Sequence, residues 1–230
     1  MRIAEIFSSR QGEGVLTGTP SVFVRASGCN LRCWFCDTPY TSWQPEGDNW
    51  SVEQIVAEVA RLRADVRHVV ITGGEPMLYA ELVPLCEHLK TADLHITIET
   101  AGTVDQPVAC DLMSISPKLA SSTPPAAIAG EWTGRHERDR HQPDVIRRLI
   151  ADYEYQLKFV IDTPADCEAV QQWLAEFPQA DRSRVLLMPQ GIELTTLGQM
   201  ASWLEPYCEQ HGFVFCPRKH IEWYGATRGT

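Results

Sequence analysis

Short apolar runs rich in β-branched residues recur along this chain and are separated by segments with helical periodicity. The runs that we expect to form strands are 3–7, 22–26, 68–72, 95–99, 112–116, 156–161, 185–188 and 213–216. Several of these runs are nearly continuous in apolar residues, which is typical of parallel strands buried on both faces. The alternation of such strands with helices predicts an α/β fold with a largely parallel sheet.

Helix start signals lie between the strands. Ser51 is followed three residues later by Gln54, which is the spacing of a capping box. Thr163 precedes Pro164 as an N-cap precedes the first helical position. We expect a further helix over about 197–211, and irregular structure over 38–49 and 120–143. The second of these stretches is long enough to be a lid, and the histidines within it, His136 and His141, are expected to be solvated.

Length, charge and hydropathy restrict the class of protein. A chain of 230 residues with 44% apolar residues is expected to form a single domain with a sizeable core. Its formal net charge is −10, which argues against non-specific nucleic-acid binding. It has no apolar run long enough to span a membrane and no signal-peptide pattern at its start, so we expect a cytoplasmic protein. In that compartment, cysteines serve as metal ligands, catalytic groups or buried thiols more often than as disulfides.

Three of the eight cysteines lie close together. Cys29, Cys33 and Cys36 follow the expected strand 22–26 with the spacing C-x3-C-x2-C. Three thiolates suit a cubane iron–sulfur cluster that leaves one iron open for another ligand. A zinc site completed by a distant residue such as His220 is the alternative, because structural zinc takes four protein ligands. The other five cysteines are expected to be buried thiols.

The cysteine spacing, with Phe35 before the last cysteine, resembles the radical S-adenosylmethionine (SAM) superfamily. The segment Gly73-Gly74-Glu75-Pro76, at the end of the expected strand 68–72, resembles the SAM-contacting turn of that superfamily. The resemblance implies a [4Fe–4S] cluster held by the three cysteines. It also implies that SAM is bound at the open iron and is cleaved there to start radical chemistry.

Further motifs narrow the resemblance. Gln-Gly-Glu-Gly at 11–14, Cys-Asp-Thr at 36–38, Ile-Glu-Thr-Ala-Gly at 98–102 and Ser-Pro-Lys at 116–118 together resemble the 7-carboxy-7-deazaguanine synthase family. The resemblance implies an incomplete, trimmed (β/α)6 barrel, a radical SAM partial TIM barrel that forms one domain over 1–230. It also implies conversion of 6-carboxy-5,6,7,8-tetrahydropterin to 7-carboxy-7-deazaguanine with loss of ammonia, a step of queuosine and 7-deazapurine biosynthesis.

Site residues follow from the same resemblance, position by position. The expected SAM contacts are Phe35, Cys36, Asp37, Gly74, Ser116, Pro117, Lys118, Met188, Pro189, Gln190 and Gly191, of which the last four depart from the Gln-Pro pattern of the family. The expected substrate contacts are Arg10, Gln11, Gly12, Arg25, Thr72, Glu99 and His220. Thr38 matches the Mg2+ position, although its hydroxyl could instead cap a turn before Pro39.

These assignments are chemically reasonable. The Arg25 guanidinium matches the geometry of a carboxylate, and Glu99 can accept two N–H bonds from a guanine-like edge. Mg2+ prefers oxygen ligands such as the Thr38 hydroxyl. Lys158, one of only four lysines, could line the same cavity. The expected partners are a pterin substrate, a flavodoxin-like or ferredoxin-like electron donor and a second copy in a homodimer.

Two other functions remain open at this point. A small glycyl-radical activase would share the cluster and the Gly-Gly-Glu-Pro segment but would act on a protein. A non-enzymatic iron–sulfur or zinc protein, such as a redox sensor, would need no SAM pocket.

Overall fold

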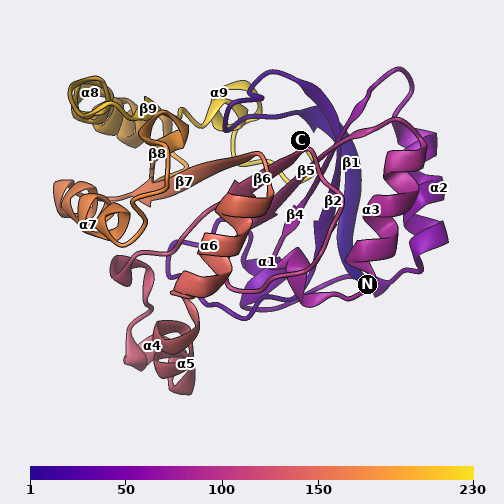
Figure 1. The fold of residues 1–230 in the computed structure, drawn as a ribbon, viewed down its shortest axis with the longest axis horizontal. Helices are drawn as coiled ribbons and strands as arrows, with labels where there is room; N and C mark the ends of the chain where they lie inside the picture. The colour runs from indigo at the N-terminus through magenta and orange to yellow at the C-terminus, as the bar shows by residue number, and fades with distance from the viewer.

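The computed structural model describes residues 1–230 and contains a single nine-stranded sheet (Figure 1). The strands follow the spatial order β3-β1-β2-β4-β5-β6-β7-β8-β9. Their bounds are β1 Arg2–Arg10, β2 Pro20–Ala26, β3 Asp48–Asn49, β4 His68–Gly73, β5 His95–Thr100, β6 Leu112–Ile115, β7 Tyr155–Ile161, β8 Val185–Pro189 and β9 Val214–Phe215. Each of the eight strands expected from the apolar runs is present.

The sheet is an open barrel. β1 runs antiparallel to β2 and β3, whereas every pair from β2 to β9 is parallel. Because β3 and β9 stand at opposite edges and do not pair, the barrel remains incomplete. Six parallel strands, β2 and β4 to β8, form the body of the barrel, and β9 adds only a two-residue strand at its edge. This confirms the prediction of an α/β fold with a trimmed, six-stranded parallel barrel.

Helices cover the outer face of the sheet. Figure 1 shows α2 and α3 at one side of the barrel, α7 and α8 at the other, and α4 and α5 projecting from one end. Their bounds are α1 Pro39–Ser42, α2 Val52–Leu62, α3 Leu82–Thr91, α4 Ala126–Ala129, α5 Glu131–Asp139, α6 Pro143–Asp152, α7 Pro164–Ala175, α8 Leu194–His211 and α9 Lys219–Tyr224. None of these helices is both long and apolar enough to span a membrane.

Local signals and burial explain the helices that position the barrel. In α2, the Gln54 N–H donates to Ser51 Oγ at 3.3 Å and the Ser51 N–H donates to Gln54 Oε1 at 2.8 Å, which confirms the capping box. Ile55 and Val59 of this helix are buried in the main core of 38 residues. Burying a side chain of this size contributes roughly 1.5–3 kcal/mol, so the inner face of α2 fixes its place against the sheet.

The expectation of an irregular stretch over 120–143 is wrong, because α4 and α5 lie within it. Two prolines precede α4 at positions where a helix tolerates them, and Pro143 opens α6. His136 is fully buried, which also corrects the expectation that it is solvated. His141 is only half-buried, with its Nε2 3.0 Å from Glu176.

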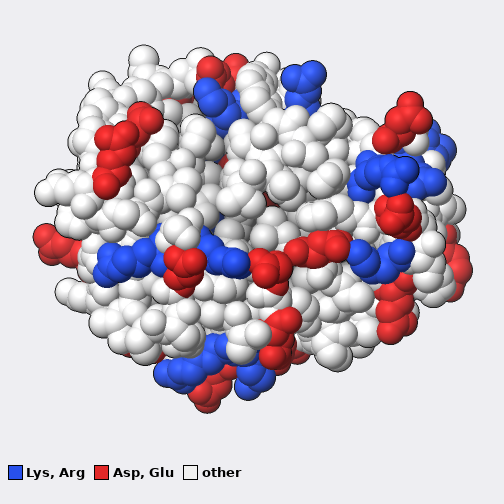
Figure 2. Space-filling model, turned by 45° about the horizontal axis from the view of Figure 1, so that its top comes forward, with Lys and Arg blue, Asp and Glu red and all other residues white.

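Acidic and basic side chains are interspersed over the face of the molecule in Figure 2.

Candidate active site

A cavity of about 610 Å3 opens at the carboxyl ends of the parallel strands, where barrels of this type place their chemistry. The predicted residues that line it are Arg10, Gln11, Gly12, Arg25, Cys29, Cys33, Phe35, Cys36, Asp37, Thr38, Thr72, Gly74, Glu99, Ser116, Lys118, Lys158, Met188, Gln190 and His220. Pro117, Pro189 and Gly191 lie outside its lining. The structure thus brings together residues from almost the entire length of the chain.

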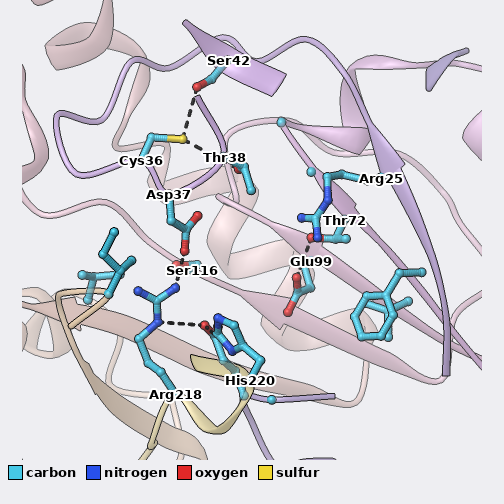
Figure 3. Close-up of a pocket in the computed structure, with 18 of the residues that line it drawn as sticks. Arg25, Cys36, Asp37, Thr38, Ser42, Thr72, Glu99, Ser116, Arg218 and His220 are labelled. Carbon is cyan, nitrogen blue, oxygen red and sulfur yellow. Dashed lines mark hydrogen bonds and ion pairs between the residues drawn. The ribbon is translucent and has the colours of Figure 1, made fainter. Parts of the chain in front are cut away.

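The three cysteines belong to the loop that follows β2. Burial raises the pKa of Cys29 to about 12 and that of Cys33 to about 11, so both are thiols until a metal replaces the proton. The Cys36 sulfur lies 3.2 Å from Ser42 Oγ (Figure 3). His220, the candidate fourth ligand of a zinc site, packs on Gly12 and lies 3.8 Å from Glu13, so the cysteine loop offers only three of the four protein ligands that structural zinc takes. Three thiols on one cavity wall fit a cubane iron–sulfur cluster, in which three of the iron corners each take one thiolate.

The Gly-Gly-Glu-Pro turn packs directly on this cysteine loop. A Cβ atom on Gly74 would lie 2.0 Å from the carbonyl oxygen of Gly28, so no larger residue fits there without movement. The Glu75 N–H donates to the same oxygen at 2.9 Å. The Glu75 carboxylate is fully buried and accepts hydrogen bonds from Thr100 Oγ1 and from the amides of Ala101 and Met77. Glu75 therefore joins the carboxyl ends of β4 and β5 and does not line the cavity.

The residues expected to contact SAM lie beside the cysteine loop. The Lys118 ammonium donates to Ser116 Oγ at 2.6 Å and to the Ser116 backbone carbonyl at 2.8 Å. Asp37 is held by the guanidinium of Arg218, a residue near the C-terminus. Arg218 also donates to the carbonyl of Gly191 at 2.7 Å. Gly191 therefore contacts Arg218 and lies outside the cavity wall.

The residues expected to contact the substrate stand opposite, as Figure 3 shows for Arg25, Thr72 and Glu99. Thr72 Oγ1 donates to Glu99 Oε2 at 2.6 Å. Arg25 Nε donates to Glu5 at 2.7 Å, and its terminal nitrogens donate to no protein group. The Gln11 amide donates to Ser21 Oγ at 2.9 Å. This side of the cavity therefore keeps a guanidinium edge and a partly exposed carboxylate available to a ligand.

Three charged residues of the cavity were missing from the sequence prediction, namely Glu13, Arg218 and Arg228. Glu13 lies 2.5 Å from Lys158 Nζ and 3.1 Å from Arg218 Nε. Burial would raise the pKa of Glu13, but the charges of Lys158, Arg218 and His220 outweigh it and hold that pKa far below its ordinary value. Glu13 stands within the Gln-Gly-Glu-Gly motif, which could have drawn attention to it. No local signal marks Arg218.

The C-terminal segment closes one side of the cavity. A Cβ atom on Gly12 would lie 2.5 Å from the Cβ of His220, so this glycine lets the segment approach. The Lys219 N–H donates to the Gly12 carbonyl at 2.8 Å, and residues 225–230 continue along the cavity wall. Arg228 pairs with Glu46 at 2.8 Å, which ties this segment to the residues after α1. Burial lowers the pKa of His220, so its ring favours the neutral form.

Thr38 lies between the cysteine loop and α1. Its side chain makes no capping hydrogen bond to the helix backbone, which removes the turn-cap alternative. Instead, Thr38 Oγ1 accepts a hydrogen bond of 3.3 Å from Thr41 Oγ1 and lies 3.9 Å from the Cys36 sulfur. Thr38 lines the cavity together with both groups of predicted ligand contacts.

Comparisons with known proteins agree with this geometry. The model of the radical SAM superfamily matches residues 23–117. The chain is 46% identical to the 7-carboxy-7-deazaguanine synthase of Rhodopirellula baltica, over 99% of this chain and 88% of that protein. It is 45% identical to the protein of the same name from Halobacterium salinarum, over 95% and 88%. The crystal structure of QueE from Escherichia coli has the same fold, with a TM-score of 0.72 at 24% identity over 95% of this chain and 94% of that one. The chain belongs to the 7-carboxy-7-deazaguanine synthase family of radical SAM enzymes.

Proposed function

We propose that this enzyme converts 6-carboxy-5,6,7,8-tetrahydropterin to 7-carboxy-7-deazaguanine with loss of ammonia. One observation carries the proposal: a single cavity has three thiols and the Gly-Gly-Glu-Pro turn at one side, and a guanidinium and a carboxylate at the other. A cofactor and a flat polar substrate can therefore meet within it. Membership of the family sets aside the alternatives of a glycyl-radical activase and a redox sensor.

In this proposal, Cys29, Cys33 and Cys36 hold a [4Fe–4S] cluster and SAM lies beside it. When bound, the cluster and SAM supply one-electron chemistry that removes a hydrogen atom from the substrate. The proposed SAM contacts are Phe35, Cys36, Asp37, Gly74, Ser116, Lys118, Met188 and Gln190. Pro117, Pro189 and Gly191 support these contacts from outside the cavity wall.

On the other side, the free nitrogens of Arg25 would pair with the carboxylate of the pterin. Each Glu99 oxygen has acceptor capacity beyond its bond to Thr72 or Lys158, so Glu99 can accept N–H groups from the amino-pyrimidine edge. His220 and residues 225–230 would exclude water from the reacting centre. Arg10, Gln11 and Gly12 complete the proposed substrate contacts.

Five further assignments belong to the proposal. Thr38 would supply one oxygen to Mg2+, which keeps several waters and takes other oxygens from the substrate. The enzyme would receive electrons from a flavodoxin-like or ferredoxin-like donor and act as a homodimer in the cytoplasm. All eight cysteines are free thiols, which fits a reducing compartment. One sheet extends from β1 to β9, which supports a single radical SAM domain over 1–230.

The decisive test is an anaerobic incubation of the reconstituted enzyme with the carboxytetrahydropterin, SAM, Mg2+ and a reductant. Mass spectrometry should find 7-carboxy-7-deazaguanine and release of one ammonia per product. The Cys33→Ala chain is the matched control and should form none. A reconstituted enzyme that cleaves SAM but leaves the pterin unchanged would contradict the proposed substrate.

A further inference from the structure

The cysteine loop rests against residues 119–141 on the side away from the cavity. The Trp34 N–H donates to the Ser122 carbonyl at 3.2 Å, and the indole Nε1 of the same residue donates to the Ser121 carbonyl at 2.8 Å. Trp34 lies between the second and third cysteines. This outer segment therefore contacts the cysteine loop through two of its backbone carbonyls. The fold of the segment fixes the positions of these carbonyls.

His136 of α5 makes the most buried of these contacts. Its Nδ1 accepts a 3.0 Å hydrogen bond from the backbone N–H of Arg32, the residue before Cys33. Its Nε2 lies 2.9 Å from Ser122 Oγ, and that hydroxyl donates to the Leu119 carbonyl at 2.7 Å. Because the Ser122 proton is directed to Leu119, the Nε2 atom carries the histidine proton. The ring is then neutral with a single tautomer, and its Nδ1 lone pair points at the loop.

Arg32 connects the loop to α5 a second time. Its Nη1 donates to the carbonyls of Cys29 and Leu31, both at 2.8 Å. The guanidinium stacks on the ring of Trp132 at 3.7 Å from the ring centroid. Both contacts of α5 therefore converge on the residue between two of the three cysteines. Arg32 itself is 8% exposed, so water does not replace a lost partner easily.

We propose that His136 is a positioning residue for the iron–sulfur cluster, because it fixes the backbone at Arg32 and thereby the direction of the Cys33 thiol. The inference rests on the proposed function, since it assumes that the three cysteines hold the cluster. It concerns a residue that reaches neither the cavity nor any cysteine sulfur. The Nδ1 atom accepts the Arg32 N–H and so holds the loop, and the Nε2 donor orients the ring by its contact with Ser122.

Two substitutions separate these atoms. The Asn side chain can place its carbonyl oxygen near the position of Nδ1, so His136→Asn can keep the acceptor for Arg32. The Gln amide extends to the position of Nε2, so His136→Gln can keep the Ser122 contact but loses the acceptor. The two variants have similar polarity. Iron-free samples of both are compared with the parent by thermal unfolding, which separates effects on the fold from effects on the loop.

The measurement is the rate at which an anaerobic chelator removes iron from the reconstituted chains, together with the EPR spectrum of the reduced cluster with and without SAM. Loss of one hydrogen bond to the loop should make His136→Gln lose iron roughly fivefold faster than the parent. Its EPR spectrum should change, whereas His136→Asn should stay close to the parent in both readouts.

Equal iron loss and equal spectra for both variants and the parent would overturn the inference. Equal damage in both variants, matched by equal loss of thermal stability, would also overturn it, because His136 would then serve the fold alone. A parent chain that binds no cluster would instead contradict the proposed function, so the two failures are distinguishable.

Discussion

Lys158 of β7 and Glu13 of the turn after β1 form a buried salt bridge with 2.5 Å between Nζ and Oε2. The same ammonium lies 3.3 Å from Glu99 Oε1. Burial would lower the pKa of Lys158, but Glu13 and Glu99 raise it well above its ordinary value, so the ion pair stays charged. One lysine thus connects segments that are far apart in the sequence and balances two carboxylates at the side of the cavity proposed for the substrate.

Removing this lysine should destabilise the fold as well as the site. Lys158→Met leaves Glu13 and Glu99 without their shared cation, which should lower the free energy of unfolding by about 3 kcal/mol. Adding Glu13→Gln should recover part of that loss, because without Lys158 the buried Glu13 carboxylate keeps only the guanidinium of Arg218, which itself retains Asp37. Urea unfolding of the two single variants and the double variant measures the coupling. Additive losses would mean that the two side chains do not interact energetically.

Cys33→Ala should abolish cluster binding, because two thiolates cannot hold the corners that three hold. Iron analysis and EPR on anaerobically prepared protein should both show the loss. Cys86→Ala is a suitable control, because this residue belongs to α3 and its thiol is buried in the main core, away from the cavity. A parent chain that is fully active in air with tightly bound zinc would contradict the cluster.

Arg25→Ala and Glu99→Ala should weaken substrate binding much more than SAM binding. Losing one partner of a desolvated charged pair costs roughly 2–5 kcal/mol, or about 30-fold to 4,000-fold in affinity. Calorimetry with each ligand separately gives both values. Lys118→Ala is the reverse control, since its ammonium donates to Ser116 on the side of the cavity proposed for SAM. If Arg25→Ala weakened SAM and substrate equally, its bond to Glu5 would be its main role.

Thr38→Ala should shift the Mg2+ dependence of the reaction to higher concentration and leave iron content unchanged. The hydroxyl offers one hard oxygen at the cavity wall, and its protein partner Thr41 would remain in place. Initial rates across a Mg2+ titration test this. Superimposable titration curves for variant and parent would assign Thr38 to the local structure alone.

Lowering the pH should destabilise the iron-free protein partly through His136. Burial, helped by the nearby Arg140, lowers the pKa of His136 to about 4, while Glu137 opposes the shift only in part. The unfolded chain takes up this proton near pH 6.5, whereas the folded chain does not. The stabilisation is therefore complete above about pH 6.5 and is lost as the pH falls toward 4. Urea unfolding at pH 7 and pH 5 should show a smaller difference for His136→Asn than for the parent; equal differences would contradict this.

The barrel was predictable because its signals are local. The apolar run that became β8 is fully buried along its length, and the capping residues of α2 stand three positions apart. Such features need no knowledge of distant residues. The cysteine spacing was equally local, and it identified one wall of the cavity.

The rest depended on contacts between distant residues. The segment containing α5 is rich in charged side chains and reads as solvated, yet His136 is buried because it meets Arg32, 104 residues earlier. Glu13 and Lys158 are 145 residues apart, and neither is surrounded by a pattern that predicts an ion pair. Only the curvature of the open sheet from β1 to β9 brings them together.

Glu75 illustrates a difficulty for mutational surveys of this enzyme. Its carboxylate has no opening to the cavity, but three hydrogen-bond donors depend on it: Thr100 at the end of β5, Ala101 just after it, and Met77 in the turn after β4. A scan that records product formation alone would rank Glu75 with the three cysteines and suggest that it takes part in the chemistry. Pairing each activity value with the folded fraction would separate this architectural glutamate from the residues that touch the ligands.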